Sequence, residues 1–408
     1  MLRSMRTPIG HLDADCFYAS AERVRYDYLR GQPVGVLGNQ GACVIAKSYE
    51  LKARGVSTGQ PIWEAVPLCP EAIFVKRDFR WYEVLSRMML AILREVSPVV
   101  EYYSIDEFFF DAAWLPRVFA ADFPAATAAL QQRILLEVGV PVSIGVSTSR
   151  TLAKLGSDIN KPFGIGILFG PEQIREFLDR QDVGEISGIG RKSVAKLHAI
   201  GIRTCLDLAE ADRHQIRKLL TITGEAIWYE LHGEPVIPIQ TERKRKQRIS
   251  RGGSLGETTS DPARINAWLT RNMERVVEEI DRLDLDCGRL TVCLMHKDWP
   301  ATARAARLDQ PTSAFESLLT AGQSLIRNCH GSVYRMHVDV DLLTARGRRQ
   351  GVLFSNPDAS PVDTLKQRVN AKLGRFALRS AATLPLAEIY ADETNDHDIC
   401  DVHGKTCF

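Results

Sequence analysis

The chain has 408 residues, of which 45% are hydrophobic and 25% charged. This is an ordinary globular composition with room for roughly two to four domains. A net charge of +2 excludes a polycation, so any nucleic-acid surface must come from local clusters of basic residues. No apolar run suggests a membrane span, the basic N-terminus is not followed by a signal-peptide core, and nine scattered cysteines suit a reducing compartment. We therefore expect a cytoplasmic protein.

The first predicted strand carries acidic residues. Residues 11–18 form a short apolar segment that is interrupted by Asp13 and Asp15, and residues 19–29 have the pattern of a helix. A carboxylate at the end of a strand often binds a ligand in an open sheet. Asp13 is therefore a candidate ligand residue.

A small strand-containing segment and a long helix follow. Residues 34–37 have the pattern of a strand, and the segment 43–52 contains Tyr49 and Lys52. On its own, Lys52 is best interpreted as part of a solvated helix face. Residues 81–96 predict an amphipathic helix, whose apolar face consists of Tyr82, Leu85, Met89, Ile92 and Leu93.

Two adjacent carboxylates, Asp106 and Glu107, then lie in an apolar setting. The flanking residues 99–100 and 108–110 are apolar, which is typical of a strand or strand-turn in a buried sheet. Neighbouring anions in such a segment repel each other and lose hydration, so they stay ionised at low cost only beside a cation. Oxygen ligands favour a hard cation, first of all Mg²⁺. Asp13 is the candidate for a third carboxylate.

The next segments alternate between helix and strand. Helices are predicted over residues 125–137 and 151–160, and a strand over residues 142–147. This alternation indicates an α/β layer. Lys161 follows the second helix, and by itself it is a cation at a helix C-terminus, where it interacts favourably with the helix dipole.

A glycine-containing turn comes next. Gly188 and Gly190 precede Arg191 and Lys192 at the start of a predicted helix, and a second Gly-Ile pair follows at 201–202. The pattern is that of a helix-hairpin-helix. Such a turn exposes backbone N–H groups at a helix N-terminus, which makes a phosphate site without sequence preference.

The most basic run, residues 243–248, leads to a new block that begins with a strand near Ser250. On sequence alone, the run is a solvated linker. The block then predicts a helix, a strand, a helix and a strand over residues 265–283, 289–295, 313–326 and 333–342. We expect a β-α-β-β-α-β-like domain, in which exposed Arg and Lys at strand edges contact phosphates.

The last part of the chain holds two short patterns besides a predicted helix over residues 362–376. Gln350, Leu353 and Phe354 follow a basic stretch, and the apolar pair either anchors a peptide in a groove or lies in a buried strand. Four residues near the end have the spacing of metal ligands: His397, Cys400, His403 and Cys407. Four ligands so close in sequence rarely complete a zinc tetrahedron, so we favour a tail that contacts a partner.

The stretches 13–20 and 104–107 together resemble the Y-family translesion DNA polymerases. The likeness extends over residues 11–354, because several separate motifs occur in the family's order and spacing. The segment 41–63 is most similar to the catalytic subunit of bacterial DNA polymerase V, and other features are shared with DNA polymerase IV. The resemblance implies a low-fidelity, damage-tolerant polymerase that adds deoxynucleotides to a primer by two-metal phosphoryl transfer.

The resemblance also implies roles for the candidate residues. Two Mg²⁺ ions would be held by the catalytic residues Asp13, Asp106 and Glu107 and by the Ala14 carbonyl. The incoming nucleotide would contact Phe17, Tyr18, Tyr49, Lys52 and Lys161. Tyr18 matches the steric gate that rejects ribonucleotides, although aromatic residues beside a strand are more often part of a core. Many relatives have Arg where this chain has Lys52, so only a point charge remains there.

For nucleic acid and partners, the resemblance implies two further sites. The DNA-binding residues would be Gly188, Gly190, Arg191 and Lys192. The pattern at Gln350, Leu353 and Phe354 resembles the peptide that binds the bacterial sliding clamp. The expected partners are primer–template DNA, deoxynucleoside triphosphates, the clamp and accessory subunits, without a membrane.

The implied fold class is α+β and multi-domain, with the architecture of a right-hand polymerase. The expected parts are a palm (1–22 and 81–175), small fingers (23–80), a helix-hairpin-helix thumb (176–240), a basic linker (241–249), an α/β little finger (250–345) and a C-terminal tail (346–408). Two alternatives remain. One is a catalytically weak accessory subunit of a mutagenesis complex, which the presence of all three acids argues against. The other is a cyclase-like nucleotidyl enzyme, which would need neither the helix-hairpin-helix nor the little finger.

Overall fold

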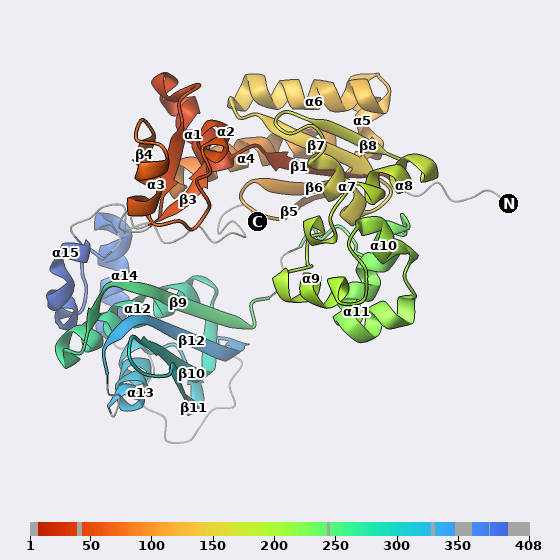
Figure 1. Cartoon of the computed structure of the whole chain (residues 1–408). Coiled ribbons are helices and arrows are strands. Elements are labelled where there is room, and N and C mark those ends of the chain that lie inside the picture. Colours follow the sequence, from red (N-terminus) through yellow and green to blue (C-terminus); the bar gives the residue numbers. More distant parts are fainter. Residues whose placement is uncertain are drawn as a thin grey trace. The chain divides into compact units, whose positions relative to one another are not determined.

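The computed structural model describes residues 7–38, 43–242, 245–327, 331–346, 361–374 and 376–390 (Figure 1). The chain divides into two compact units, and the division falls between residues 243 and 244. None of the helices in these ranges combines the length and the apolarity needed to cross a bilayer. The predicted clamp peptide at 350–354 and the four residues at 397–407 lie outside the described residues.

The first unit is built on a five-stranded sheet in the order β5-β6-β1-β7-β8. Its strands are β1 (Ile9–Ala14), β5 (Val100–Tyr102), β6 (Glu107–Asp111), β7 (Val142–Ser147) and β8 (Ile165–Leu168). Its helices are α4 (Phe79–Val96), α5 (Leu115–Phe119), α6 (Phe123–Val138), α7 (Arg150–Ser157) and α8 (Pro171–Asp179), with a 3₁₀ turn η3 (Ala112–Trp114). This sheet and its helices correspond to the expected palm.

Side-chain alternation assigns the two faces of this sheet. Phe108 and Phe110 lie in the core that is built with α4 and α6, whereas Phe109 lies on the other face with Ala153 of α7. The close approach of α7 requires Gly145 in β7, because a Cβ there would lie 2.0 Å from the Ala153 carbonyl oxygen. The apolar face predicted for residues 81–96 is confirmed, since all five of its residues are buried.

Several element boundaries differ from the predictions for local reasons. The carboxylate segment, predicted as a strand or strand-turn, is a hairpin of β5 and β6, with the turn at 103–106. The helix predicted over 19–29 is α1 (Phe17–Arg25) followed by η1 (Asp27–Leu29), because Tyr26 has an extended backbone. Helix α7 ends at Ser157 and not at residue 160.

Two smaller parts complete the first unit. The segment corresponding to the fingers has a sheet in the order β3-β2-β4, made of β2 (Val34–Leu37), β3 (Val44–Lys47) and β4 (Ile73–Lys76), with helices α2 (Tyr49–Ala53) and α3 (Ile62–Leu68). The segment corresponding to the thumb is helical, with η4 (Val183–Glu185), α9 (Arg191–His198), α10 (Cys205–Glu210) and α11 (Arg213–Leu231). The thumb has its own apolar core, which Leu152 and Leu155 of α7 join.

The second unit has the expected β-α-β-β-α-β order, and the one element for which the sequence analysis gave no range is the strand β11 (Thr302–Thr312). Its elements are β9 (Arg248–Thr259), α12 (Pro262–Arg282), β10 (Leu285–His296), β11 (Thr302–Thr312), α13 (Phe315–Ile326) and β12 (Val333–Ala345). The sheet order is β11-β10-β12-β9. Further along the chain lie α14 (Pro361–Leu373), η5 (Ala381–Leu386) and α15 (Ala387–Tyr390).

The basic segment predicted as a linker over 241–249 is partly structured. Strand β9 already begins at Arg248, whose guanidinium lies 3.2 Å from Asp339. Lys246 lies 2.9 Å from Glu279 of α12. Part of the basic charge of this run is therefore neutralised within the second unit.

A buried ion pair joins three parts of the first unit. Glu101 of β5 pairs with Arg150 at the start of α7, and each side chain is 9% exposed. Arg150 also donates to the Pro238 carbonyl over 2.9 Å, and the Gln240 N–H donates to Glu101 over 2.7 Å. The segment that leaves the thumb is thereby held against the palm.

Removing one charge of this pair is expected to destabilise the protein. Glu101→Gln leaves Arg150 buried without its counter-ion, which should lower the free energy of unfolding by roughly 3 kcal/mol in urea denaturation. The control is Glu95→Gln, because Glu95 is 61% exposed and pairs with Arg133 at the surface. That change should cost less than about 1 kcal/mol. Equal losses in the two variants would contradict the structural role of the buried pair.

Candidate active site

Three carboxylates gather where β1 ends and β6 begins. Asp13 is the register partner of Glu107 on the neighbouring strand, and β1 lies at the centre of the sheet. The Ala14 N–H donates to the Asp106 carbonyl oxygen over 2.9 Å, which ties the β5–β6 turn to the end of β1. The structure therefore brings together the three acids that the sequence singled out.

Each of these carboxylates has a partner within the protein. Asp13 lies 3.0 Å from the Lys161 ammonium, and Glu107 pairs with Lys154 of α7. Asp106 accepts a hydrogen bond of 2.5 Å from the Ser104 hydroxyl. Lys154 was not singled out in the sequence, since only the packing of α7 brings it to the acids, and Ser104 was named only as part of the stretch 104–107.

The electrostatics of the site reflect crowded, partly buried anions. Burial and the charge of Glu107 raise the pKa of Asp13 to about 6, although Lys161 opposes this shift. Burial and the charge of Asp13 also raise the pKa of Asp106, against the Ser104 hydrogen bond. Burial alone would lower the pKa of Lys161, but Asp13 and Asp158 raise it overall. The site therefore holds its negative charge only with cations beside it.

The donor chemistry fits a hard divalent cation. The donors are carboxylate oxygens, and a cation would relieve their mutual repulsion as the lysines do here. Among the described residues, no three His, Cys, Asp or Glu side chains form a ready metal-binding group. The ligand set of the three acids and the Ala14 carbonyl stays a prediction.

The aromatic pair at the start of α1 has two different environments. The ring of Tyr18 is half-buried and stacks on Tyr82, with 4.7 Å between the centroids and 14° between the planes. Phe79 contacts Tyr18 edge-on. Phe17 is only 3% exposed and lies in the palm core. Its side chain is thus a core residue, which leaves its backbone for the predicted nucleotide contact.

The two candidate residues on α2 lie near the acids. The Tyr49 hydroxyl donates to Asp15 over 3.3 Å, and burial followed by the charge of Asp15 raises the pKa of Tyr49. Lys52 is exposed, and its ammonium lies 5.9 Å from the centre of the Tyr49 ring. Both side chains thus border the end of β1, on the side of the fingers.

Asp15 is a functional candidate that the sequence analysis did not assign. The residue is 1% exposed, and its carboxylate accepts from the Ser143 hydroxyl at 2.9 and 3.1 Å. It also accepts from the Phe163 N–H at 2.7 Å, two residues after Lys161. Asp15 therefore contacts Tyr49 and the segment just after Lys161, and both of these residues are predicted to contact the nucleotide. The spacing Asp-x-Asp at 13–15 was the available signal.

We expect Asp15→Asn to weaken nucleotide binding more than DNA binding. All three of the partners of Asp15 are donors, so an amide would place its own N–H₂ group against one of them. Losing one or two such hydrogen bonds costs about 1–1.5 kcal/mol. Steady-state primer extension should then show a KM for the nucleotide raised roughly tenfold.

The DNA affinity of this variant should stay unchanged. Asp27→Asn is the matched control, because Asp27 is 84% exposed and pairs with Arg30 at the surface. A lower melting temperature with an unchanged KM would show that Asp15 has only a structural role.

The predicted helix-hairpin-helix has the expected local geometry. Gly188 has a φ of 96°, a left-handed conformation that favours glycine, and Ile189 is buried. Gly190 is the N-cap of α9, so the exposed Arg191 and Lys192 occupy its first turn. The turn thus presents backbone N–H groups and two cations to solvent.

The second unit presents a partly basic sheet face. Arg289 of β10 is the register partner of Arg307 on β11 and of Asp341 on β12, and Asp341 in turn pairs with Arg248 of β9. Side chains in such a row lie on one face. Arg289 makes two hydrogen bonds of 2.7 Å to Asp341, so part of this charge is internally neutralised.

Comparisons with known proteins agree with this geometry. A model of the impB/mucB/samB family matches residues 12–158, and a model of the C-terminal domain of that family matches residues 246–353. DNA polymerase IV 1 of Bacillus subtilis is 32% identical over 391 residues, which cover 93% of this chain and 94% of that protein. DNA polymerase IV of Oceanobacillus iheyensis is 38% identical over 305 residues, covering 74% of this chain and 72% of the relative. A solved Y-family DNA polymerase chimera matches with a TM-score of 0.70 at 24% identity, over 83% of this chain and 100% of that one, which shows the shared fold.

Proposed function

The chain belongs to the impB/mucB/samB family of Y-family translesion polymerases, it is a DNA-directed DNA polymerase, and we propose that Asp13, Asp106 and Glu107 form its catalytic centre. The observation that supports this centre most directly is the meeting of the three carboxylates at the ends of β1 and β6. An accessory subunit without catalysis would not need such an unfavourable concentration of charge.

We propose that the three acids and the Ala14 carbonyl would hold two Mg²⁺ ions. Divalent ions bound there would supply Lewis-acid activation of the primer 3′-hydroxyl and charge neutralisation on the triphosphate. Lys154 pairs with Glu107 and Lys161 with Asp13, so the site already combines its acids with protein cations. The Ser104 hydroxyl fixes the orientation of the Asp106 carboxylate through its short hydrogen bond.

Binding of the incoming nucleotide would involve the start of α1 and the cations around it. A triphosphate carries several negative charges, and the first N–H groups of a helix suit such an anion. Lys161 supplies a charge from the palm side and Lys52 from α2, next to Tyr49. The ring of Tyr18 would close the space that a ribose 2′-hydroxyl needs.

DNA binding would use sequence-independent contacts. The first turn of α9, with Gly190, Arg191 and Lys192, would bind backbone phosphate. The arginines on the sheet face of the second unit, Arg248, Arg289 and Arg307, would add further phosphate contacts and a strong salt dependence. We also propose the cytoplasmic location that the sequence predicted, and the predicted domain boundaries with the start of the little finger moved to Arg248, where β9 begins.

Primer extension tests the proposed function. Purified protein should extend a primer on an undamaged template with Mg²⁺ and should stop when EDTA is added. Each nucleotide is supplied in the deoxy and in the ribo form, and only the deoxy form should be added. Tight binding of primer–template without any addition would favour the accessory alternative, in which other subunits are needed for synthesis.

We further propose that residues 350–354 bind the bacterial sliding clamp. The double change Leu353→Ala with Phe354→Ala removes both apolar anchors and should weaken binding to the purified clamp at least tenfold in surface plasmon resonance. Synthesis without the clamp should not change. The control is Arg348→Ala, which removes a nearby charge but neither anchor. Equal clamp binding by the double variant and the wild type would refute this site.

A further inference from the structure

Helix α1 carries a row of three side chains that meets the N-terminal end of α4. Tyr18, Glu22 and Arg25 stand at positions i, i+4 and i+7 of α1, so they lie on one face of the helix. The Tyr18 ring stacks on the ring of Tyr82, and Glu22 accepts a hydrogen bond of 2.7 Å from the Tyr82 hydroxyl. Arg25 donates to Asp78, the N-cap of α4, over 2.8 Å. Tyr82 is thus held by two residues of α1 that lie one turn apart.

The hydrogen bond between Tyr82 and Glu22 is buried. Tyr82 is 0% exposed and Glu22 is 1% exposed. Burial, followed by the charge of Glu22, raises the pKa of Tyr82, so the hydroxyl keeps its proton and donates it. Arg25 neutralises the Glu22 carboxylate, and its guanidinium lies 3.1 and 2.9 Å from the two carboxylate oxygens. A buried hydrogen bond to a charged acceptor is among the stronger ones in a protein, so it fixes the hydroxyl end of Tyr82 firmly.

The position of the Tyr82 ring decides how much room lies beside the ring of Tyr18. The two rings are nearly parallel, with 14° between their planes and 4.7 Å between their centroids. Phe79 and Phe17 contact the Tyr82 ring in edge-to-face arrangements, at centroid distances of 5.8 and 6.2 Å. These contacts restrain the body of the ring, whereas the bond to Glu22 restrains its far end. A shift of Tyr82 would open space into which the Tyr18 ring could move.

We propose that Glu22 is a positioning residue for the selection of the nucleotide sugar. Its carboxylate fixes Tyr82, and Tyr82 in turn prevents the Tyr18 ring from moving aside for a ribose 2′-hydroxyl. Because Glu22 is buried, it acts through the two stacked rings and not by contact with the nucleotide. The role of Glu22 rests on the proposed function, in which Tyr18 is the steric gate.

Ribonucleotide selection in two single variants tests the role of Glu22. Tyr82→Phe keeps the stacked ring and removes only the hydroxyl group, and Glu22→Ala removes the acceptor. In each variant, the ratio of kcat/KM for a ribonucleotide to that for the matching deoxynucleotide should rise roughly three- to tenfold, because only the support of the gate is lost. The double variant should show no more than the larger single effect, because both substitutions remove the same hydrogen bond. If Glu22→Ala does not fold, Tyr82→Phe alone decides the result.

Tyr102→Phe is the matched control. Tyr102 of β5 is also buried, and its hydroxyl shares a hydrogen bond of 2.8 Å with Ser86 of α4, but its ring packs on Phe108. This variant should lower the free energy of unfolding in urea denaturation and leave the sugar ratio at the wild-type value. A rise of the ratio as large as that in Tyr82→Phe would show that any loss from the core relaxes selection, which contradicts a specific role for Glu22.

Tyr18→Ala distinguishes a failure of the gate from a failure of its support. In the Tyr18→Ala background, Tyr82→Phe should cause no further change of the sugar ratio, and a further rise would show an action outside the gate. An unchanged ratio in Tyr82→Phe and Glu22→Ala, together with a raised ratio in Tyr18→Ala, would overturn the role of Glu22 and leave the gate in place. An unchanged ratio in Tyr18→Ala itself would refute the gate, and the role of Glu22 with it.

Discussion

Asp106→Asn is expected to abolish primer extension while primer–template binding stays intact. The amide keeps the shape of the side chain and can still accept from Ser104, so the β5–β6 turn should keep its conformation. It removes one negative charge from the proposed metal site. Metal assistance is worth several kcal/mol, so the rate of nucleotide addition should fall by at least about a hundredfold. Single-turnover extension measures the rate, and fluorescence anisotropy measures DNA affinity.

The matched control for this prediction is Asp111→Asn at the other end of the same strand. Asp111 accepts from the Ala113 N–H over 2.9 Å and caps the turn after β6, away from the three acids. Its substitution should affect stability slightly and leave the rate of extension unchanged. Extension by Asp106→Asn at the wild-type rate would contradict the proposed role of the three carboxylates in catalysis.

Tyr18→Ala is expected to admit ribonucleotides. The ring is held by stacking on Tyr82 and by the edge of Phe79, so it cannot easily move aside for a 2′-hydroxyl. Steric discrimination by one small group is typically worth about 1–3 kcal/mol. Incorporation of a ribonucleotide relative to the matching deoxynucleotide, measured as the ratio of kcat/KM values, should therefore rise roughly ten- to hundredfold.

A variant that lacks only the hydroxyl group of Tyr18 distinguishes a steric gate from a residue that only packs. Tyr18→Phe keeps the ring and should keep ribonucleotides excluded, whereas both variants should retain the fold by circular dichroism. If Tyr18→Ala lowered the use of both nucleotide types equally, the ring would be a packing residue and not a gate. Selectivity lost in Tyr18→Phe would place the discrimination in the hydroxyl instead.

Much of the architecture could be predicted because it depends on local patterns. The 3.6-residue period of residues 81–96 predicts α4, and the strand and helix periods after Ser250 predict the elements from β9 to β12 except β11. Asp106 and Glu107 stood out because two anions in an apolar strand require a cation. The predicted boundaries were less accurate where one residue decides the end of an element, as Tyr26 does after α1.

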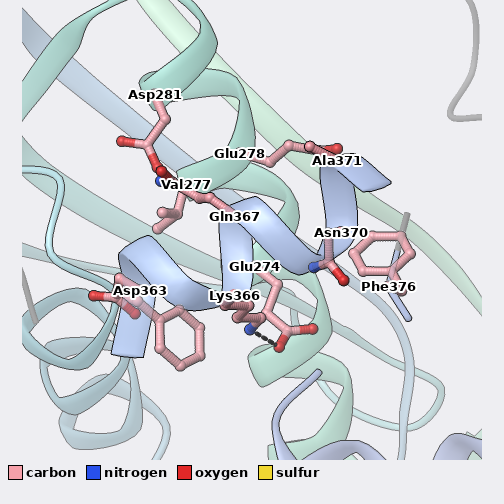
Figure 2. A pocket seen from close by; sticks show the side chains of 11 residues that line it. Glu274, Val277, Glu278, Asp281, Asp363, Lys366, Gln367, Asn370, Ala371 and Phe376 are labelled. Atoms are coloured by element: carbon pink, nitrogen blue, oxygen red, sulfur yellow. Dashed lines mark hydrogen bonds and ion pairs between the residues drawn. The ribbon is translucent and has the colours of Figure 1, made fainter. Parts of the chain in front are cut away.

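Most of the elements and the family motifs with their three acids could be read from the sequence. Which groups surround those acids became known from the packing of the folded chain. Lys154 reaches Glu107 because Gly145 lets α7 approach the sheet. Asp15 accepts hydrogen bonds from Ser143 and Phe163, which are far from it in the chain. The ion pair between Lys366 of α14 and Glu274 of α12 likewise joins residues that are far apart in the chain (Figure 2). Such contacts depend on packing between distant segments, and a local pattern of residue types carries no information about which segments will meet.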